Sequence, residues 1–340
     1  MVHKRKKIKV LMIMGGIGPT KEKKFAGIFS ERQADSLSKL GIEIHRIYVG
    51  RGFSLFQPIK SFFCLLYKRW KIKPDIIHAQ YGSMTGFLGV LTQGKAPLII
   101  SFCGSDLLGA CRSNGKKNIR GEMGVKLSKI AANYASGIIV KSKGLMDALP
   151  DSCRPKAKII PSGVDLKLFY PIDQDEARRK LQLPIDKKII LFNMGSNGAN
   201  KNLKLAQESF TLVQGKRSDV ILFLIQNEPP EKIPLIMAAS DVLLVTSYHE
   251  GSPNIVKEAL ACNLPVISVP CGDVKERLQG VYPSFVVNYS PKAIANAIYE
   301  TLKINKRSNG REKVQDLSVE ETANQIKDFY CKIINKSDEK

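Results

Sequence analysis

Two glutamates with seven residues between them, Glu250 and Glu258, stand where an apolar run gives way to a helix-like stretch. Gly251, Ser252 and Pro253 follow the first acid as a polar turn. Pro253 suits the first position of a helix, because its missing N–H costs nothing there. A carboxylate accepts hydrogen bonds from pairs of hydroxyl groups, so these acids could hold the hydroxyls of a sugar and of a ribose. Taken alone, they would also suit a helix cap and a solvated helix position.

The same turn predicts a site for an anion. Ser252 is a suitable N-cap, and the backbone N–H groups of Ser252, Asn254 and Ile255 would lack partners within the helix. Free N–H groups at a helix N-terminus bind phosphate, and Gly251 would let the backbone approach a ligand closely. The segment therefore combines donors for a diphosphate with acceptors for hydroxyl groups.

Strands and helices must position these residues, and the chain alternates between the two. Short apolar runs separated by longer stretches of helical periodicity predict parallel strands joined by crossover helices. The strands expected in the first half are Lys9–Met14, Glu43–Tyr48, Asp75–Ala79, Leu98–Phe102, Gly137–Val140 and Lys158–Pro161. The helices expected there are Lys23–Leu40, Pro58–Lys71, Ser83–Gln93, Glu122–Ala135 and a short one after Lys143.

The second half repeats the pattern. Its expected strands are Lys188–Asn193, Val220–Ile225, Val242–Thr246, Pro265–Val269 and Phe285–Val287. Its expected helices are Asn202–Val213, Pro253–Cys262, Val274–Gln279, Pro291–Leu302 and Val319–Ile334. The fold class is therefore α/β, with two Rossmann-like, doubly wound parallel-sheet domains that face a cleft. Ligands of such sheets bind beyond the carboxyl ends of the strands, so loops of both domains would line the site.

Composition excludes several classes of protein. The formal net charge of +22 attracts polyanions, unless it only serves solubility. No zinc-finger, RNP-like or helix-turn-helix motif accompanies this charge, so we expect no nucleic-acid partner. Seven cysteines without a C-x-x-C pair argue against a disulfide framework or a structural zinc site. The apolar runs are too short for a signal peptide or a membrane span, so we expect a cytoplasmic protein.

The segment from 240 to 268 resembles the donor-binding signature of the family-4 glycosyltransferases, which have the GT-B fold. Glu250 and Glu258 meet the Glu-x7-Glu spacing of that signature. The surrounding context is met by Gly251, Pro253, Ala259, Ala261, Pro265 and Val266. The resemblance implies that Glu250 binds the donor sugar and that Glu258 binds the ribose.

Two further segments resemble the same family in the expected order. Residues 159–165, followed by Phe169 and Pro171, are similar to its interdomain segment, with Ser162 in place of the usual Asn. Residues 193–202 are similar to the loop whose lysine contacts the donor diphosphate, which implies that role for Lys201. A surface lysine in a turn is the alternative. Ser196 stands in this loop where an arginine is common.

The first half supplies weaker signals. Gly15 and Gly16 follow the first strand as a glycine turn, which would equally suit a dinucleotide-binding fold, although the G-x-G-x-x-G order is absent. In the family such a turn lies near the donor and the acceptor. The stretch Ser101–Asp106 resembles a family segment that carries a His near the donor sugar, and Cys103 replaces that His. We expect Cys103 to be a buried, inert thiol. Asp106 would bind a hydroxyl or orient the loop, and His78 is a relocated His or a structural residue.

A basic amphipathic stretch at 53–73 suits an anionic membrane surface, with a core-facing crossover helix as the alternative. Its large apolar residues are Phe56, Ile59, Phe62, Phe63, Leu66 and Trp70. We expect any membrane contact to be peripheral, at the inner face of the plasma membrane.

The resemblance implies a retaining, metal-independent transfer without a cofactor, from a UDP- or GDP-sugar to a sugar or lipid-linked acceptor in bacterial cell-surface polysaccharide or glycolipid synthesis. Glu250, Lys201 and Asp106 are the expected catalytic residues. The expected domains are an acceptor-side domain at 1–168, a donor-binding domain at 169–315 and a helix at 316–340 that packs back toward the first. Prolines and charges near 169–184 are typical of a linker. The alternatives are a catalytically degenerate scaffold subunit and a GT-B sugar-nucleotide epimerase.

Overall fold

The computed structural model describes residues 7–16, 27–50, 56–109, 118–195, 198–226 and 228–338. They divide into two compact units. The first contains the described residues up to 109 together with 118–163 and 319–338, and the second spans 164–318. The chain passes from the first unit to the second at residue 164 and returns to the first with its last helix. Across the described ranges, no helix combines the length and the apolar character needed to cross a bilayer.

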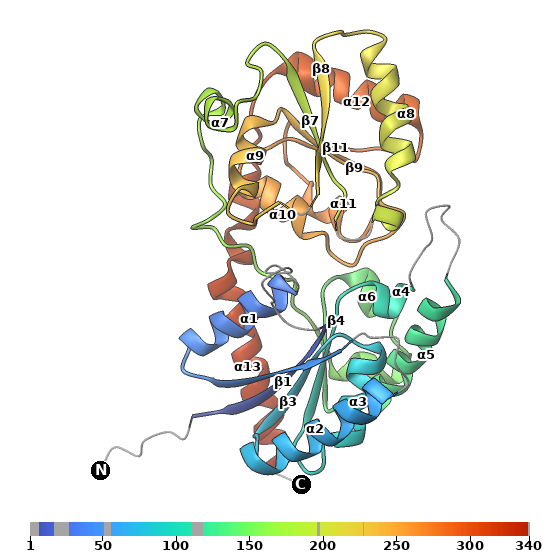
Figure 1. The fold of residues 1–340 in the computed structure, drawn as a ribbon, viewed down its shortest axis with the longest axis vertical. Coiled ribbons are helices and arrows are strands. Elements are labelled where there is room, and N and C mark those ends of the chain that lie inside the picture. Colours follow the sequence, from blue (N-terminus) through green and yellow to red (C-terminus); the bar gives the residue numbers. More distant parts are fainter. Residues whose placement is uncertain are drawn as a thin grey trace. The chain divides into compact units, whose positions relative to one another are not determined.

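A six-stranded parallel sheet forms the centre of the first unit (Figure 1). Its strands are β1 (Lys9–Gly15), β2 (Glu43–Val49), β3 (Ile76–Gln80), β4 (Leu98–Phe102), β5 (Gly137–Val140) and β6 (Ala157–Ile159). The strand order is β2-β1-β3-β4-β5-β6. The chain therefore reverses its winding direction between β1 and β3, the position where doubly wound sheets bind ligands.

Helices cover both faces of this sheet, and two hydrophobic clusters fill the space between. The helices are α1 (Ile28–Lys39), α2 (Phe56–Ile72), α3 (Ser83–Thr92), α4 (Ser105–Leu108), α5 (Ile119–Tyr134), α6 (Lys143–Asp147) and α13 (Val319–Asp338), with a 3-10 helix at Asp151–Lys156. Helices α1 and α13 pack on one face, whereas α2, α3 and α5 pack on the other (Figure 1). The last helix is therefore part of the core of the first unit.

A buried polar network attaches α13 to the sheet. His78, on β3, lies 2.5 Å through Nδ1 from the Tyr330 hydroxyl of α13 and 2.8 Å through Nε2 from Ser101 Oγ of β4. All three side chains are fully buried. Burial, together with the nearby positive charge of Lys141, lowers the pKa of His78 to about 3. His78 is therefore neutral and structural, and the relocated-His interpretation is wrong.

The second unit has a five-stranded parallel sheet in the order β11-β10-β9-β7-β8. Its strands are β7 (Lys188–Asn193), β8 (Val220–Ile225), β9 (Val242–Val245), β10 (Val266–Ser268) and β11 (Phe285–Val286). Its helices are α7 (Gln174–Leu181), α8 (Leu203–Gln214), α9 (Ile233–Ala239), α10 (Asn254–Ala261), α11 (Val274–Arg277) and α12 (Pro291–Ile304), with 3-10 helices at Gly198–Lys201 and Gly310–Leu317. Counted within the unit, this order repeats that of the first five strands of the first unit, and its switch point lies between β7 and β9.

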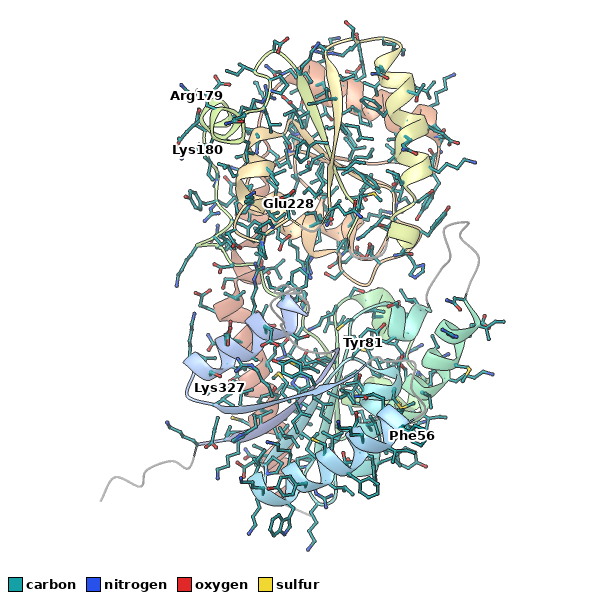
Figure 2. All side chains as sticks on the ribbon, viewed as in Figure 1. Phe56, Tyr81, Arg179, Lys180, Glu228 and Lys327 are labelled. Atoms are coloured by element: carbon teal, nitrogen blue, oxygen red, sulfur yellow. The ribbon has the colours of Figure 1, made fainter. Side chains whose placement is uncertain are left out.

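Two helices of the second unit, α7 and α9, were not predicted from the sequence. The charged stretch interpreted as part of a linker forms α7, whose Arg178 is buried and donates 2.8 Å to Asp241. Asp241 also accepts from Lys188 at 3.1 Å, so this charged helix is fixed to the sheet. Figure 2 shows the next residues, Arg179 and Lys180, on the outer side of α7. Hydrophobic periodicity does not identify a helix that is attached through a buried arginine, because arginine is expected at the surface.

The low pKa of His78 predicts a specific dependence of stability on pH. The unfolded chain takes up a proton at this residue near pH 6.5, whereas the folded chain resists protonation until about pH 3. Stability therefore falls as the pH drops through this range, by about 2 kcal/mol between pH 7 and pH 5 for this one group. Urea unfolding of wild type and His78→Gln should show this extra pH-dependent loss only in wild type. His45→Gln, at a half-exposed site, is the control, and equal pH profiles for wild type and His78→Gln would contradict the account.

Candidate active site

Two loops meet at the switch point of the second sheet. One follows β7 and ends in Lys201, and the other follows β9 and carries Glu250. The ammonium of Lys201 donates 2.7 Å to Glu250 Oε1, and the Ser247 hydroxyl donates to the same oxygen at 2.9 Å. The side chains of Lys201 and Glu250 are about one-fifth exposed, so a ligand can reach both.

Hydrogen bonds hold the two loops together. The Thr246 hydroxyl donates to the backbone oxygens of Lys201 and Asn202 at 2.8 and 3.0 Å. The N–H of Tyr248 donates to the Asn200 oxygen at 3.0 Å, and the Asn200 amide donates to the His249 oxygen at 2.5 Å. Lys201 is therefore held by neighbouring backbone contacts and is not a free surface lysine.

Helix α10 begins with an arrangement that differs from the predicted cap. Pro253 occupies the N-cap position in an extended conformation, so it is not the first helical residue. Ser252 lies one residue too early to cap the helix, and its hydroxyl donates 2.9 Å to Asp273 Oδ2. The predicted capping role of Ser252 is therefore wrong. No side chain caps this helix, which leaves the start of α10 available to an anion.

A buried charged network supports the turn from below. Asp273 is 6% exposed, and its Oδ2 also accepts from Arg277 Nε at 2.9 Å. Lys257, 1% exposed, donates to the Ser252 hydroxyl at 3.2 Å. Asp273, Arg277 and Lys257 were not predicted from the sequence. The available signal was that Lys257 directly follows the apolar pair Ile255 and Val256 of α10.

Close backbone packing completes the support. Gly272 has φ +57°, and a Cβ there would lie 3.0 Å from the Gly251 oxygen and 3.2 Å from the Glu250 oxygen. Only glycine combines that conformation with so close an approach. The loop before α11 therefore contacts the back of the turn that carries Glu250.

Two buried oxygens of this site have no hydrogen-bond partner among the described residues: Asn254 Oδ1 and Asp273 Oδ1. Buried polar atoms are nearly always paired, so each such exception needs a reason. Asn254 is the first residue of α10, so a hydroxyl of a ligand at the start of this helix would supply the missing donor to Asn254 Oδ1. Glu258, 7% exposed, lies on the same helix.

The arrangement suits a ligand that carries both a diphosphate and hydroxyls. Without a ligand, Lys201 and Glu250 neutralise each other. A diphosphate would attract the ammonium of Lys201, and Glu250 would then accept from a hydroxyl. The start of α10 would add backbone donors and the positive end of a helix dipole.

The predicted residues of the first unit have different surroundings. Gly15 ends β1, and Gly16 adopts φ +122°, which favours glycine. Asp106 is fully buried and accepts the backbone N–H groups of Cys103, Gly104 and Gly82, so it orients this loop. Burial raises the pKa of its carboxyl. Ser196, from the Lys201 loop, lies outside the described residues.

Cys103 is exposed, so the expectation of a buried thiol is wrong. The preceding residue, Phe102, is the last of β4 and is fully buried, and the strand ends there. Cys103 therefore lies at the carboxyl edge of the sheet.

Two family models match the chain. The model described as glycosyl transferases group 1 matches residues 184–303, and the one described as glycosyl transferase 4-like matches residues 27–142. The first of these matches lies in the second unit, and the described residues of the other match lie in the first unit. The fold and the matches together define a glycosyltransferase with the GT-B fold.

Comparison with individual proteins gives the same class. A putative teichuronic acid biosynthesis glycosyltransferase of Bacillus subtilis is 23% identical over 86% of this chain and 88% of its own length. Sucrose-phosphate synthase of Thermosynechococcus elongatus superposes with a TM-score of 0.77 at 19% identity, over 97% of this chain and 100% of that one. The Anabaena protein HepE, solved with UDP and glucose, gives 0.71 at 15% identity, over 96% and 100%. Different parts of the chain thus match models of the group 1 and the 4-like glycosyltransferases, and both matches indicate the same class of enzyme.

Epimerases share the fold at a lower similarity. A putative UDP-N-acetylglucosamine 2-epimerase of Listeria monocytogenes gives a TM-score of 0.61 at 13% identity, over 94% of this chain and 95% of that one. The two-unit architecture alone therefore does not distinguish transfer from epimerisation.

The Asp273 network predicts a measurable loss of stability. Asp273→Asn keeps the shape of the side chain but removes the negative charge that faces Arg277. Because that charge is buried, we expect the free energy of unfolding to fall by about 2–4 kcal/mol. Asp316→Asn, at an exposed site of the same unit, should cost less than about 0.5 kcal/mol. Chemical denaturation measures both, and similar losses in the two variants would contradict a supporting role for Asp273.

Proposed function

We propose that this glycosyltransferase is retaining and metal-independent and moves a sugar from a UDP- or GDP-sugar to a sugar or lipid-linked acceptor. The observation that carries the proposal is the contact between Lys201 and Glu250 beside the uncapped start of α10. The bound UDP of HepE and the teichuronic acid role in the name of the Bacillus relative support it. The pathway we propose is bacterial cell-surface polysaccharide or glycolipid synthesis.

In the proposed reaction, Lys201 and the first amides of α10 hold the diphosphate and stabilise the negative charge that develops as it leaves. Glu250 holds a hydroxyl of the donor sugar, and Glu258 holds the ribose. The acceptor hydroxyl attacks the anomeric carbon on the face from which the diphosphate departs, and its proton passes to a phosphate oxygen. The enzyme thus acts by positioning and by electrostatic stabilisation.

We expect Lys201→Met to lower kcat/KM for transfer at least about 100-fold, because the charge facing the leaving diphosphate is lost. Glu258→Gln should lower it through weaker binding of the ribose. Lys204→Met replaces an exposed lysine three residues away on α8 and should leave turnover unchanged. The measurement is transfer from the nucleotide sugar whose nucleoside diphosphate stabilises the protein most strongly against heat.

Each result separates the proposal from its rivals. Epimerised donor formed without an acceptor would favour the epimerase. Donor binding without turnover across a panel of acceptors would favour a scaffold subunit. Near-normal transfer by Lys201→Met would refute the site.

Helix α2 supports a peripheral membrane contact. Its inner side buries Ser61 and Leu65, and Phe62 packs partly against the core. Its outer side carries a stripe at helical spacing: Phe56 (77% exposed), Ile59 (54%), Phe63 (63%), Tyr67 (54%) and Trp70 (71%). Figure 2 shows Phe56 at the surface.

Basic residues accompany the stripe. Lys60, Lys68 and Lys71 are exposed on the same helix, and Lys73 follows its end. An apolar stripe with lysines around it fits an anionic lipid surface, in which the rings enter the interface and the ammonium groups meet the headgroups. We therefore propose that α2 lies against the inner face of the plasma membrane, which would bring a lipid-linked acceptor to the enzyme.

Flotation with vesicles tests this contact. Wild type should float with vesicles that contain anionic lipid and much less with zwitterionic ones. The double variant Phe63→Ser/Trp70→Ser should bind at least about tenfold more weakly, because it lacks two exposed aromatic rings that would enter the lipid interface. Tyr134→Ser, at an exposed aromatic residue of α5, is the matched control. Flotation by the double variant at the wild-type level would rule out α2 as the contact.

A further inference from the structure

Lys141 is a buried lysine without a hydrogen-bond partner in the described part of the chain. It directly follows β5 and is 3% exposed. Burial lowers the pKa of its ammonium group. An unpaired buried cation costs several kcal/mol, so proteins rarely keep one unless it serves a purpose.

No group in the described part of the chain accepts a hydrogen bond from Lys141. The nearby carboxylate is Asp106, which favours the charged lysine through space while its oxygens accept three backbone N–H groups. His78 is neutral at physiological pH. The remaining titratable neighbour is Cys103, whose thiolate would favour the charged lysine. Among the described residues, Lys141 therefore has charged neighbours but no direct hydrogen-bond partner.

The lysine also lies at the carboxyl edge of the sheet, which is the edge where ligands of doubly wound sheets bind. The last paired residues of β4 and β5 are Phe102 and Val140, so Cys103 and Lys141 follow them side by side at the carboxyl edge of the sheet. Cys103 is exposed there, whereas Lys141 lies beneath the surface. Tyr81, labelled in Figure 2, follows the neighbouring strand β3, and its hydroxyl contacts Ser105 at 2.6 Å. The same edge of the sheet therefore carries an exposed thiol, a buried lysine and the hydroxyls of Tyr81 and Ser105.

We propose that Lys141 and Cys103 form a subsite for the negatively charged group, a carboxylate or a phosphate, of an acidic sugar substrate. The sugar part of this inference rests on the proposed function. An anionic group that entered beside Cys103 would give Lys141 its missing partner, and hydroxyls of the same sugar would reach Tyr81 and Ser105. The subsite makes the enzyme selective for charged over neutral sugars.

Alkylation of the thiols tests the subsite without any need for glycosyl transfer. Iodoacetate and iodoacetamide both attach their CH₂ carbon to a thiolate sulfur with loss of iodide, but only iodoacetate carries a carboxylate. We expect the ratio of the iodoacetate rate to the iodoacetamide rate to be at least about tenfold higher at Cys103 than at Cys64, measured by peptide mass spectrometry. Cys64 is an exposed cysteine of the same unit and serves as the internal reference.

Two variants test whether Lys141 causes the higher ratio of labelling rates at Cys103. Lys141→Met should reduce the ratio at Cys103 to that at Cys64, and it should raise the melting temperature by about 2–4 °C because an unpaired buried charge is removed. Lys143→Met, at an exposed lysine two residues away, should change neither quantity. Equal ratios at the two cysteines in wild type, or an unchanged ratio in Lys141→Met, would overturn the proposal.

Sugars added during the labelling identify the anionic group. Glucuronate tests a carboxylate, glucose 6-phosphate tests a phosphate, and glucose is the neutral control. Slower labelling of Cys103 by one acidic sugar, at concentrations where glucose has no effect, supports the subsite and names its ligand. Protection by neither acid, or equal protection by all three, would refute a site for acidic sugars. Because labelling requires no turnover, these results are independent of whether the transfer reaction itself is confirmed.

Discussion

The contact between Lys201 and Glu250 is the interaction on which the account of the site depends. It joins the loops after β7 and β9, two adjacent strands whose following connections wind in opposite directions. This reversal leaves space beyond the strand ends, because the helices that follow them cover opposite faces of the sheet. A lysine and a glutamate placed there neutralise each other in the empty site and can separate when a diphosphate and a hydroxyl compete for them.

Buried charged side chains of the two units differ in whether they have a partner of opposite charge. In the second unit, Asp273 lies between Ser252 and Arg277, and Asp241 accepts from Arg178 and Lys188. These charges are paired, and they hold a turn and a helix in place. Lys141 of the first unit has no such partner among the described residues. Paired charges here define structure, and the unpaired charge is the one we assign to a ligand.

The fold class could be predicted from the sequence because buried parallel strands are continuous apolar runs. Strands such as Leu98–Phe102 and Gly137–Val140 are fully buried and lie where the pattern placed them. Helix α7 was missed because its position depends on Arg178, whose burial requires a distant aspartate. Helix α9, Ile233–Ala239, was missed because seven mainly apolar residues show too little helical periodicity to identify.

The site could be predicted in part. The acids and the start of α10 belong to one continuous segment with recognisable spacing, and Lys201 followed from the family resemblance. The role of Ser252 was wrong because it depends on the conformation of Pro253 and on Asp273, which is 21 residues away. The exposure of Cys103 and the isolation of Lys141 depend on where two strands end relative to one another, which the local pattern does not specify.

A crystal structure of the full chain with a bound nucleoside diphosphate tests the central claim most directly. The account predicts that the phosphates lie at the first amides of α10 and within hydrogen-bonding distance of Lys201 Nζ, with the contact between Lys201 and Glu250 opened. A diphosphate bound elsewhere, with that contact intact, would contradict it.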